Sequence, residues 1–427
     1  MSCPSNVLQF TPAANADREL LRAALSQVRE GHALPQVLYR DPAVFRLDMR
    51  HFVLAHWHCV GHASELPAAG DWLTAEIGGE SVIVVRGADG EIRGLLNVCR
   101  HRGSRVCQAP SGHAPGGVLV CPYHAWAYDT TGALQRARST EPDFPKELYG
   151  LRRVAVRVAE GLIFASFADT PLGFDHVEEA FAKSLRVYGW SRAKVAARRL
   201  YQIDANWKLV EENYQECYHC GPSHREYSKR HVFARPAAQR EEADARMCAR
   251  DQALGLALDD FDAFARDASP GQESADCSRS ALVEGFRSGS RDGGLVAPLM
   301  GDFRGRDADG GFSFVDVGPT SNFVAYPDYG LVYRTIPQAP DRTAFELTWL
   351  VDQDAVEGRD YQLDDLLWMW HGTSLEDKQI IEMNQAGVNS AWFEPGPYTP
   401  MESDARRYID WYLAEMRAAA KDGGRPA

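Results

Sequence analysis

The sequence lacks long apolar runs, a leader-like beginning and an excess of basic residues. No apolar run approaches the roughly 18 residues that suggest a membrane span, so we expect no transmembrane helix. Residues 1–15 contain no basic stretch followed by an apolar one, so we expect no signal peptide and a cytoplasmic location. The 427 residues include 46 basic and 59 acidic side chains, a net charge of −13, which argues against a nucleic-acid-binding protein.

Cysteine is also sparse. Nine cysteines are scattered along the chain, and an odd, dispersed set does not form a disulfide framework. We therefore expect reduced thiols, some of them metal ligands. The remaining composition, 45% hydrophobic and 25% charged, is that of a globular protein long enough for two domains.

The chain divides into three predicted parts, which together indicate an α+β fold. Residues 1–40 contain an amphipathic helical pattern. Residues 41–170 consist of short β-type runs separated by glycine, with hairpin signals at Asp89-Gly90 and Thr131-Gly132. In residues 171–427, strand-like segments alternate with longer helical ones. Within this part, residues 241–294 are charged and rich in Ser, Asp and Gly, and we interpret them as a mobile insertion or lid, or equally as a surface loop.

A mixed cysteine and histidine motif lies in the β-rich part. Cys99 and His101 form one short pair, and Cys121 and His124 form a second pair. A Rieske [2Fe–2S] cluster needs this inventory, because two cysteines hold one iron and two histidines hold the other. The same four residues would also suit a structural zinc site. Cys59 with His62 has ligand-like spacing but lies in an apolar strand-like run, so we assign that pair to the core.

A second histidine pair, His219 and His224, follows a helical pattern. Two histidines and one carboxylate around a metal with open positions make a non-haem Fe(II) site. Gly221-Pro222 lies between them and predicts a helix end there, which would let His224 fold back toward the same metal. Cys217 and Cys220 flank His219 as a CxxC, which leaves a zinc or thiol-redox site as an alternative.

The carboxylate must come from elsewhere in the chain, and Asp377 is the candidate. Its spacing from Ser374 also fits a capping box, in which Asp377 would only stabilise a helix N-terminus. By spacing alone the capping role is favoured. Glu376 and Glu382 are the rival carboxylates.

Longer motifs carry a family resemblance. The runs 97–103 and 121–126 resemble the Rieske domains of aromatic-ring hydroxylases. The runs 212–220, 349–361 and 384–398 extend the resemblance over nearly the whole chain. It resembles the alpha subunits of Rieske non-haem iron oxygenases, most closely the quaternary-ammonium N-demethylases that act on glycine betaine and stachydrine.

This resemblance implies an all-β Rieske domain, a helix-grip (START-like) catalytic domain with an antiparallel sheet and long C-terminal helices, and a homotrimer. It implies a [2Fe–2S] cluster and a mononuclear Fe(II), electrons from an NAD(P)H-dependent reductase or ferredoxin, and O₂ as co-substrate. It makes Asp377 an iron ligand at the start of a helix. It also places Asn213 and Glu216 in the catalytic motif, with Glu216 bridging a cluster histidine of one subunit and an iron-ligand histidine of the next.

The implied reaction is hydroxylation of a small organic substrate, above all oxidative N-demethylation of a betaine-like compound. An arene-dihydroxylating dioxygenase is the alternative, and a non-catalytic metal-binding or electron-transfer protein is the remote one. For a quaternary ammonium, aromatic side chains could form a cation–π cage. The residues we nominate for it are Tyr326, Tyr333, Trp368 and Trp392.

Overall fold

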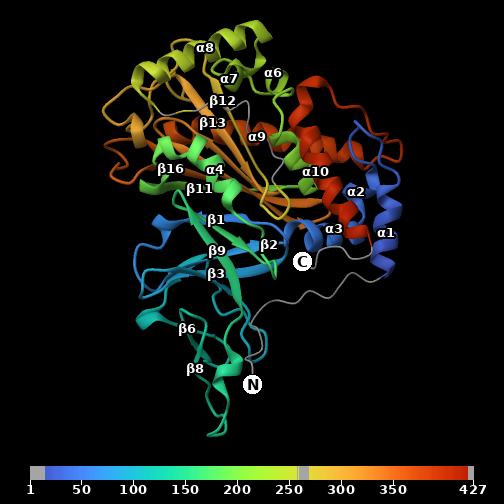
Figure 1. Cartoon of the computed structure of the whole chain (residues 1–427), viewed down its shortest axis with the longest axis vertical. Helices are drawn as coiled ribbons and strands as arrows, with labels where there is room; N and C mark the ends of the chain where they lie inside the picture. Colours follow the sequence, from blue (N-terminus) through green and yellow to red (C-terminus); the bar gives the residue numbers. More distant parts are fainter. Residues whose placement is uncertain (1–14, 257, 259–268, 422–427) are drawn as a thin grey trace.

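The computed structural model describes residues 15–256, 258 and 269–421, and its three sheets are antiparallel. Within those residues no helix combines the length and apolar character that crossing a membrane requires. Figure 1 shows a small sheet at one end of the molecule, a larger sheet in the middle, and the third sheet with its helices at the other end.

The β-rich part contains two of these sheets. The predicted hairpins are confirmed: Gly90 and Gly132 have φ of 85° and 88°, a left-handed conformation that glycine adopts without steric cost. The small sheet consists of β6 (Val118–Val120), β7 (Ala127–Asp129) and β8 (Leu134–Arg136). In spatial order the larger sheet is β1 (His58–His62), β10 (Leu162–Ser166), β9 (Arg153–Ala159), β4 (Ile92–Leu96), β3 (Glu80–Arg86), β2 (Asp71–Ile77) and β5 (Ser111–His113).

The third sheet has six strands. Residues 323–337 contain parts of two strands joined by a turn at residues 326–329. In spatial order the strands are β11 (Ala193–Ile203), β16 (Arg342–Asp352), β15 (Gly330–Ala339), β14 (Ser321–Ala325), β13 (Gly311–Val317) and β12 (Ala275–Ala281). Its associated helices are α4 (Asp175–Ser184), α5 (Trp207–Tyr214), α6 (Cys220–Ser223), α7 (Arg225–Ser228), α8 (Ala237–Leu254), α9 (Leu363–Val388) and α10 (Ser403–Ala420).

The described residues of the segment 241–294 contain a helix and a strand, so they are not a plain surface loop. Helix α8 covers its beginning, and strand β12 pairs along its whole length with β13, so β12 is an edge strand of the six-stranded sheet. Alternating burial along the start of β12 explains this, because Ala275 and Cys277 are buried while Asp276 is half-buried and Ser278 is exposed. Residues 257 and 259–268 lie outside the described residues.

The first helices do not form a separate unit. They are α1 (Asn15–Leu25), α2 (Gln36–Arg40) and α3 (Pro42–Asp48). Figure 1 shows α1 beside α10, and the Arg22 side chain donates a hydrogen bond to the Ala420 carbonyl at 2.9 Å. Leu21 of α1 and Tyr412 of α10 belong to the same hydrophobic core. Helices α1 and α10 therefore pack together although they are far apart along the chain.

Two candidate metal centres

The four cluster candidates lie on two loops, one that follows β4 and one between β6 and β7. Cys99 and Cys121 are buried, at 3% and 2% exposure, and the hydroxyl of Tyr128 lies 3.2 Å from the Cys99 sulfur. The rings of His101 and His124 lie nearer the surface, 4.6 Å apart between centroids. The structure thus brings all four together, with the thiols inside and the imidazoles outside.

The two loops share one backbone design. The amide of Gly103 donates to the Cys99 carbonyl, and the amide of Ala125 donates to the Cys121 carbonyl, each at 3.0 Å. Gly103 and Ala125 are also both left-handed, with φ of 76° and 57°. Alanine disfavours this conformation, so the sequence alone gives no signal for it at Ala125.

These residues suit a two-iron cluster better than one zinc. In the described parts of the chain, the cysteine and histidine quartet does not gather around a single ion position, as a tetrahedral zinc requires. Nδ1 of His124 is buried and has no hydrogen-bond partner there, so it is available as a metal ligand. Asn97 braces the connecting loop by accepting hydrogen bonds from the amides of Val106 and Cys107, both at 2.9 Å.

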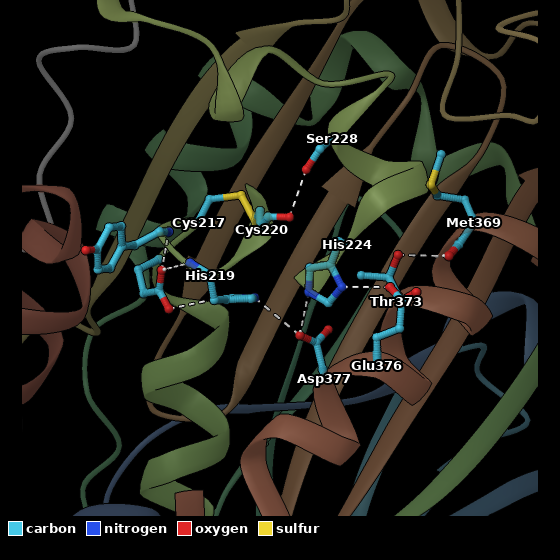
Figure 2. Close-up of polar contacts among 11 residues, drawn as sticks. Cys217, His219, Cys220, His224, Ser228, Met369, Thr373, Glu376 and Asp377 are labelled. Carbon is cyan, nitrogen blue, oxygen red and sulfur yellow. Dashed lines mark hydrogen bonds and ion pairs between the residues drawn. A yellow bond between two sulfur atoms is a disulfide. The ribbon is translucent and has the colours of Figure 1, made fainter. Parts of the chain in front are cut away.

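The second centre joins His219, His224 and Asp377. Oδ1 of Asp377 lies 3.3 Å from Nε2 of His219 and 2.8 Å from Nε2 of His224. Figure 2 shows the two histidines and Asp377 converging on one point. One ligand atom from each residue lies within 4.8 Å of the others, which is compact enough for a single ion. Two imidazoles and one carboxylate are the donor set of a non-haem Fe(II) site.

The histidine segment reaches this point differently from our expectation. Helix α5 already ends at Tyr214, before His219, so the predicted helix end at Gly221-Pro222 is wrong. Gly221 and Pro222 instead lie inside the four-residue helix α6. Proline is tolerated there because the first amides of a helix have no partner within the helix. His219 and His224 immediately flank α6, and this one turn brings their rings together.

Asp377 is in the interior of α9, not at a helix start. The helix begins at Leu363, so both the capping-box interpretation and the expected position at a helix start are wrong. The helix continues through Gly372 because residues before and after it share one buried face. This face includes Trp370, Ser374 and Ile381. Asp377 lies on the same face at 3% exposure and is therefore held against the histidines.

Two further carboxylates orient the histidines. Nδ1 of His219 lies 2.6 Å from Oε1 of Glu216, and Nδ1 of His224 lies 2.8 Å from Oε2 of Glu376. Such contacts hold the proton on Nδ1 and leave Nε2 free to bind a metal. Glu376, which we considered as a rival ligand, is therefore a partner of His224. The other rival, Glu382, instead accepts from the Asp204 amide at 3.0 Å.

The electrostatics of this centre favour a positive charge. Burial lowers the pKa of His219, but hydrogen bonds with Asp377 and Glu216 outweigh it and raise the pKa to about 9. Burial would also raise the pKa of Asp377, yet its hydrogen bonds with His219 and His224 lower it. A divalent cation would satisfy the same carboxylates, so both the donor set and its charge fit iron.

Cys217 and Cys220 are joined by a disulfide. This corrects our expectation of reduced thiols for these two residues, and Figure 2 shows the disulfide beside His219. The pair had been a candidate zinc or thiol-redox site, and a disulfide sulfur is not a thiolate ligand. Cys59 and His62 lie in the core as expected: Cys59 is fully buried, and Nε2 of His62 lies 3.0 Å from the Trp190 carbonyl oxygen.

A cavity of about 170 Å³ opens beside the second centre. Asn213 and Glu216 line it together with the three candidate ligands. Oδ1 of Asn213 is buried without a hydrogen-bond partner in the described structure. Its other wall, which we did not predict, comes from β12, β13 and α10 and includes Asp276, Asp316, Asp404 and Arg407.

The nominated aromatic cage is wrong. Tyr326 and Tyr333 are buried in the core and do not line the cavity, and Trp392 is 92% exposed. The ring of Trp368 makes a cation–π contact with Arg230, whose guanidinium carbon lies 4.6 Å from the ring centroid. The aromatic side chains that do line the cavity are Tyr214, Tyr227, Phe233, Phe314 and Trp370.

Both candidate centres lie in segments that match known protein families. Residues 56–157 match the family described as the Rieske [2Fe-2S] domain, and residues 190–418 match the ring hydroxylating alpha subunit (catalytic domain). The chain is 36% identical to the glycine betaine monooxygenase oxygenase subunit of Chromohalobacter salexigens, over 94% of this chain and 89% of that protein. It is 35% identical to the subunit of the same name in Pseudomonas aeruginosa, over 95% and 93%.

Solved structures share the fold. A quaternary ammonium Rieske monooxygenase superposes with a TM-score of 0.68 at 20% identity and covers 96% of this chain and 100% of that one. Naphthalene 1,2-dioxygenase from Rhodococcus sp. superposes with a TM-score of 0.64 at 21% identity, covering 95% and 99%. At these identities the likeness establishes the architecture alone, which is a Rieske domain joined to a catalytic domain.

Proposed function

We propose, on the premise that this chain belongs to the family of Rieske-type ring-hydroxylating oxygenase alpha subunits, that it removes a methyl group oxidatively from a small quaternary-ammonium compound. The family makes the chain an oxidoreductase with a [2Fe–2S] cluster and a mononuclear iron. One observation supports the substrate class: relatives that align over almost their whole length are named glycine betaine monooxygenase oxygenase subunits.

We assign the metal ligands residue by residue. Cys99, His101, Cys121 and His124 hold the cluster, and His219, His224 and Asp377 hold the iron. When bound, these groups supply stored electrons and the activation of O₂. The protein keeps the ligands in place: Glu216 and Glu376 fix the histidine tautomers, and the aromatic walls of the cavity exclude water.

The proposed reaction balances as a monooxygenation. One oxygen atom enters a methyl C–H bond of the substrate, and the other leaves as water with two electrons and two protons. The N-hydroxymethyl product then breaks its C–N bond and releases formaldehyde, a tertiary amine and a proton. An oxygenase subunit of this family needs an electron-donor protein, and we propose an NAD(P)H-dependent reductase or a ferredoxin, in the cytoplasm.

We further propose that the chain forms a homotrimer in which electrons pass between subunits. Within one chain, the small sheet that carries the second cluster loop and the helix α6 lie at opposite ends (Figure 1). Oε1 of Glu216 contacts Nδ1 of His219, and Oε2 accepts from the backbone amides of Tyr218 and His219. We propose that Glu216 also accepts a hydrogen bond from a cluster histidine of the neighbouring subunit, because a carboxylate oxygen can accept more than one N–H donor.

A product assay tests the reaction. The holoenzyme, supplied with a surrogate reductase and O₂, should release formaldehyde from quaternary-ammonium compounds in proportion to the O₂ consumed. Formation of arene diols without formaldehyde would instead identify a ring dioxygenase. Metal analysis should find iron and acid-labile sulfide, and a colourless protein that contains only zinc would refute both oxygenase functions.

The Glu216→Ala variant tests the bridge. It should keep both metals and normal reduction of the cluster by dithionite, while reoxidation of the cluster in the presence of substrate and O₂ becomes slow. If Glu216 only orients His219 within its own subunit, iron content should fall and reoxidation should fall in proportion to it. Glu226→Ala is the matched control, because it removes a carboxylate of α7 that pairs with Lys229 at 2.6 Å and does not line the cavity.

A further inference from the structure

The disulfide between Cys217 and Cys220 encloses one of the proposed iron ligands. His219 lies between the two cysteines, so the S–S bond closes a short loop, residues 217–220, around it. This loop lies between helices, because α5 ends at Tyr214 and α6 begins at Cys220. The disulfide is therefore a covalent restraint on the backbone that carries His219.

Glu216 restrains the same loop through hydrogen bonds. Its Oε1 lies 2.6 Å from Nδ1 of His219, and its Oε2 accepts from the amides of Tyr218 and His219. The side chain of Tyr218 is 50% exposed, so water reaches this loop and can compete for such hydrogen bonds. The covalent bond between the cysteines does not open in this way. Its loss should therefore loosen the loop around His219.

The disulfide is accessible from the cavity. Cys217 is half-buried and Cys220 is 6% exposed, and both residues line the cavity beside the iron ligands. A small dithiol that enters the cavity can therefore reach the S–S bond. In the cytoplasm, the location we propose, thiol reductants make most disulfides transient, and those that do form are usually catalytic or redox-sensing.

We propose that Cys217 and Cys220 are a reversible thiol–disulfide site that sets how tightly the mononuclear iron is held. In reduction, a dithiol gives two electrons and two protons to the S–S bond, which breaks into two thiols, and the dithiol becomes a cyclic disulfide. The same exchange with an oxidised dithiol forms the bond again. The inference rests on the proposed function, because it takes His219 as an iron ligand.

The oxidised loop should bind iron more tightly than the reduced loop. In the reduced protein, the iron-free loop has more backbone conformations available, and His219 loses this entropy when it binds the metal. The disulfide excludes many of these conformations before iron binds. For a closed loop this short, we expect reduction to weaken iron binding about tenfold.

The test measures thiols and iron binding in the same samples. The holoenzyme is equilibrated under argon with reduced or with oxidised dithiothreitol, which is then removed. Alkylation followed by peptide mass spectrometry should find Cys217 and Cys220 modified in the reduced sample and protected in the oxidised one. Competition with a ferrous chelator should show that reduction weakens binding of the mononuclear iron about tenfold. The visible spectrum of the cluster should stay constant.

Two variants separate the disulfide from general effects of the dithiol. The double variant Cys217→Ser with Cys220→Ser cannot form the bond, so it should bind iron like the reduced wild type after either treatment. A normal cluster spectrum shows that it folds. Cys248→Ser is the control, because Cys248 is an exposed cysteine of α8 that does not line the cavity. It should respond to both treatments like the wild type.

The possible outcomes distinguish this inference from the proposed function. Equal iron binding by the reduced and oxidised wild type would overturn the inference, as would alkylation of Cys217 and Cys220 in both samples. A response of the double variant to dithiothreitol would do the same. If His219→Ala keeps its iron, the ligand assignment fails and the inference fails with it. If His219→Ala loses its iron but the wild type ignores its redox state, only the thiol–disulfide site is overturned.

Discussion

Each histidine of the iron site touches two carboxylates. His219 contacts Asp377 and Glu216, and His224 contacts Asp377 and Glu376. Only Asp377 is shared, and it meets both rings at Nε2. We therefore propose the shared carboxylate as the ligand and the other two as partners that fix the proton on Nδ1.

Replacing Asp377 by alanine should remove the mononuclear iron and turnover and leave the visible spectrum of the cluster unchanged. A lost helix cap would instead cost about 1 kcal/mol of stability with activity retained, but Asp377 is in a helix interior. Iron analysis and the visible spectrum of the purified variant measure both effects. Glu382→Ala on the same helix is the control and should keep its iron. Full iron content in Asp377→Ala would contradict the assignment.

Glu212 is a buried carboxyl group with a raised pKa. Burial raises its pKa to about 7, although hydrogen bonds from Tyr39 at 2.7 Å and Tyr398 at 3.2 Å and the nearby Lys208 lower it. The negative charge of Glu402 also raises the pKa of Glu212. The folded state thus holds a proton that the unfolded chain releases near pH 4.5.

The direction in which the stability of the protein changes with pH follows from the raised pKa of Glu212. Stability from protonated Glu212 is complete below the unfolded pKa and is lost as the pH rises from about 4.5 to about 7. Glutamine does not titrate, so Glu212→Gln should not lose this stability. The free energy of unfolding of the variant, relative to that of the wild type, should therefore rise by about 2–3 kcal/mol from pH 5 to pH 8. Melting temperatures of both proteins at the two pH values measure it. A difference in melting temperature between the two proteins that is the same at both pH values would show that Glu212 does not titrate in this range.

At the scale of elements, the two cluster loops have the same backbone but different residues at their left-handed position. Ala125 at φ 57° is strained, whereas Gly103 at φ 76° is not. A methyl group added at Gly103 would meet nothing within 4 Å, so conformation alone decides the effect there. One substitution in each loop should therefore change the stability of the protein, in opposite directions.

Gly103→Ala should destabilise the cluster domain by about 1 kcal/mol, and Ala125→Gly should stabilise it by a similar amount. Both variants should keep the normal Rieske spectrum, because no ligand changes. The temperature at which the visible absorption of the cluster is lost reports both effects. Shifts of the same sign would mean that the two loops are not conformationally equivalent.

At the scale of the whole molecule, the small sheet next to the second cluster loop and the helix α6 next to the proposed iron ligands lie at opposite ends of the picture in Figure 1. Transfer between subunits can be tested with mixed trimers. Cys99→Ala subunits lack the cluster and Asp377→Ala subunits lack the iron, so each homotrimer should be inactive. Co-expressed subunits should regain part of the turnover, because an intact cluster then faces an intact iron across an interface.

The control for the mixed trimers is co-expression of Cys99→Ala with Cys121→Ala, since neither subunit type then has a cluster and turnover should stay absent. Turnover is measured as formaldehyde per iron-containing subunit. If electrons moved only within one chain, the first mixture would be as inactive as its parents.

The sequence by itself determined the ligand inventory and the small turns. Cys99 with His101, Cys121 with His124, and His219 with His224 are each separated by a few residues, so the short chain between the members of a pair holds them near one another. Asp89-Gly90 and Thr131-Gly132 are equally local, because a turn depends only on its own backbone angles. The two-domain α+β organisation followed from these signals together with the resemblance.

Only the tertiary structure decided which distant residues meet. Asp377 reaches the histidines because one face of α9 is buried continuously, which overrode the local capping signal at Ser374. The polar wall of the cavity unites Asp276, Asp316 and Arg407, which come from two strands and a helix far apart along the chain. Such contacts arise from packing of surfaces, whose register no local pattern specifies, and for the same reason the nominated aromatic cage failed.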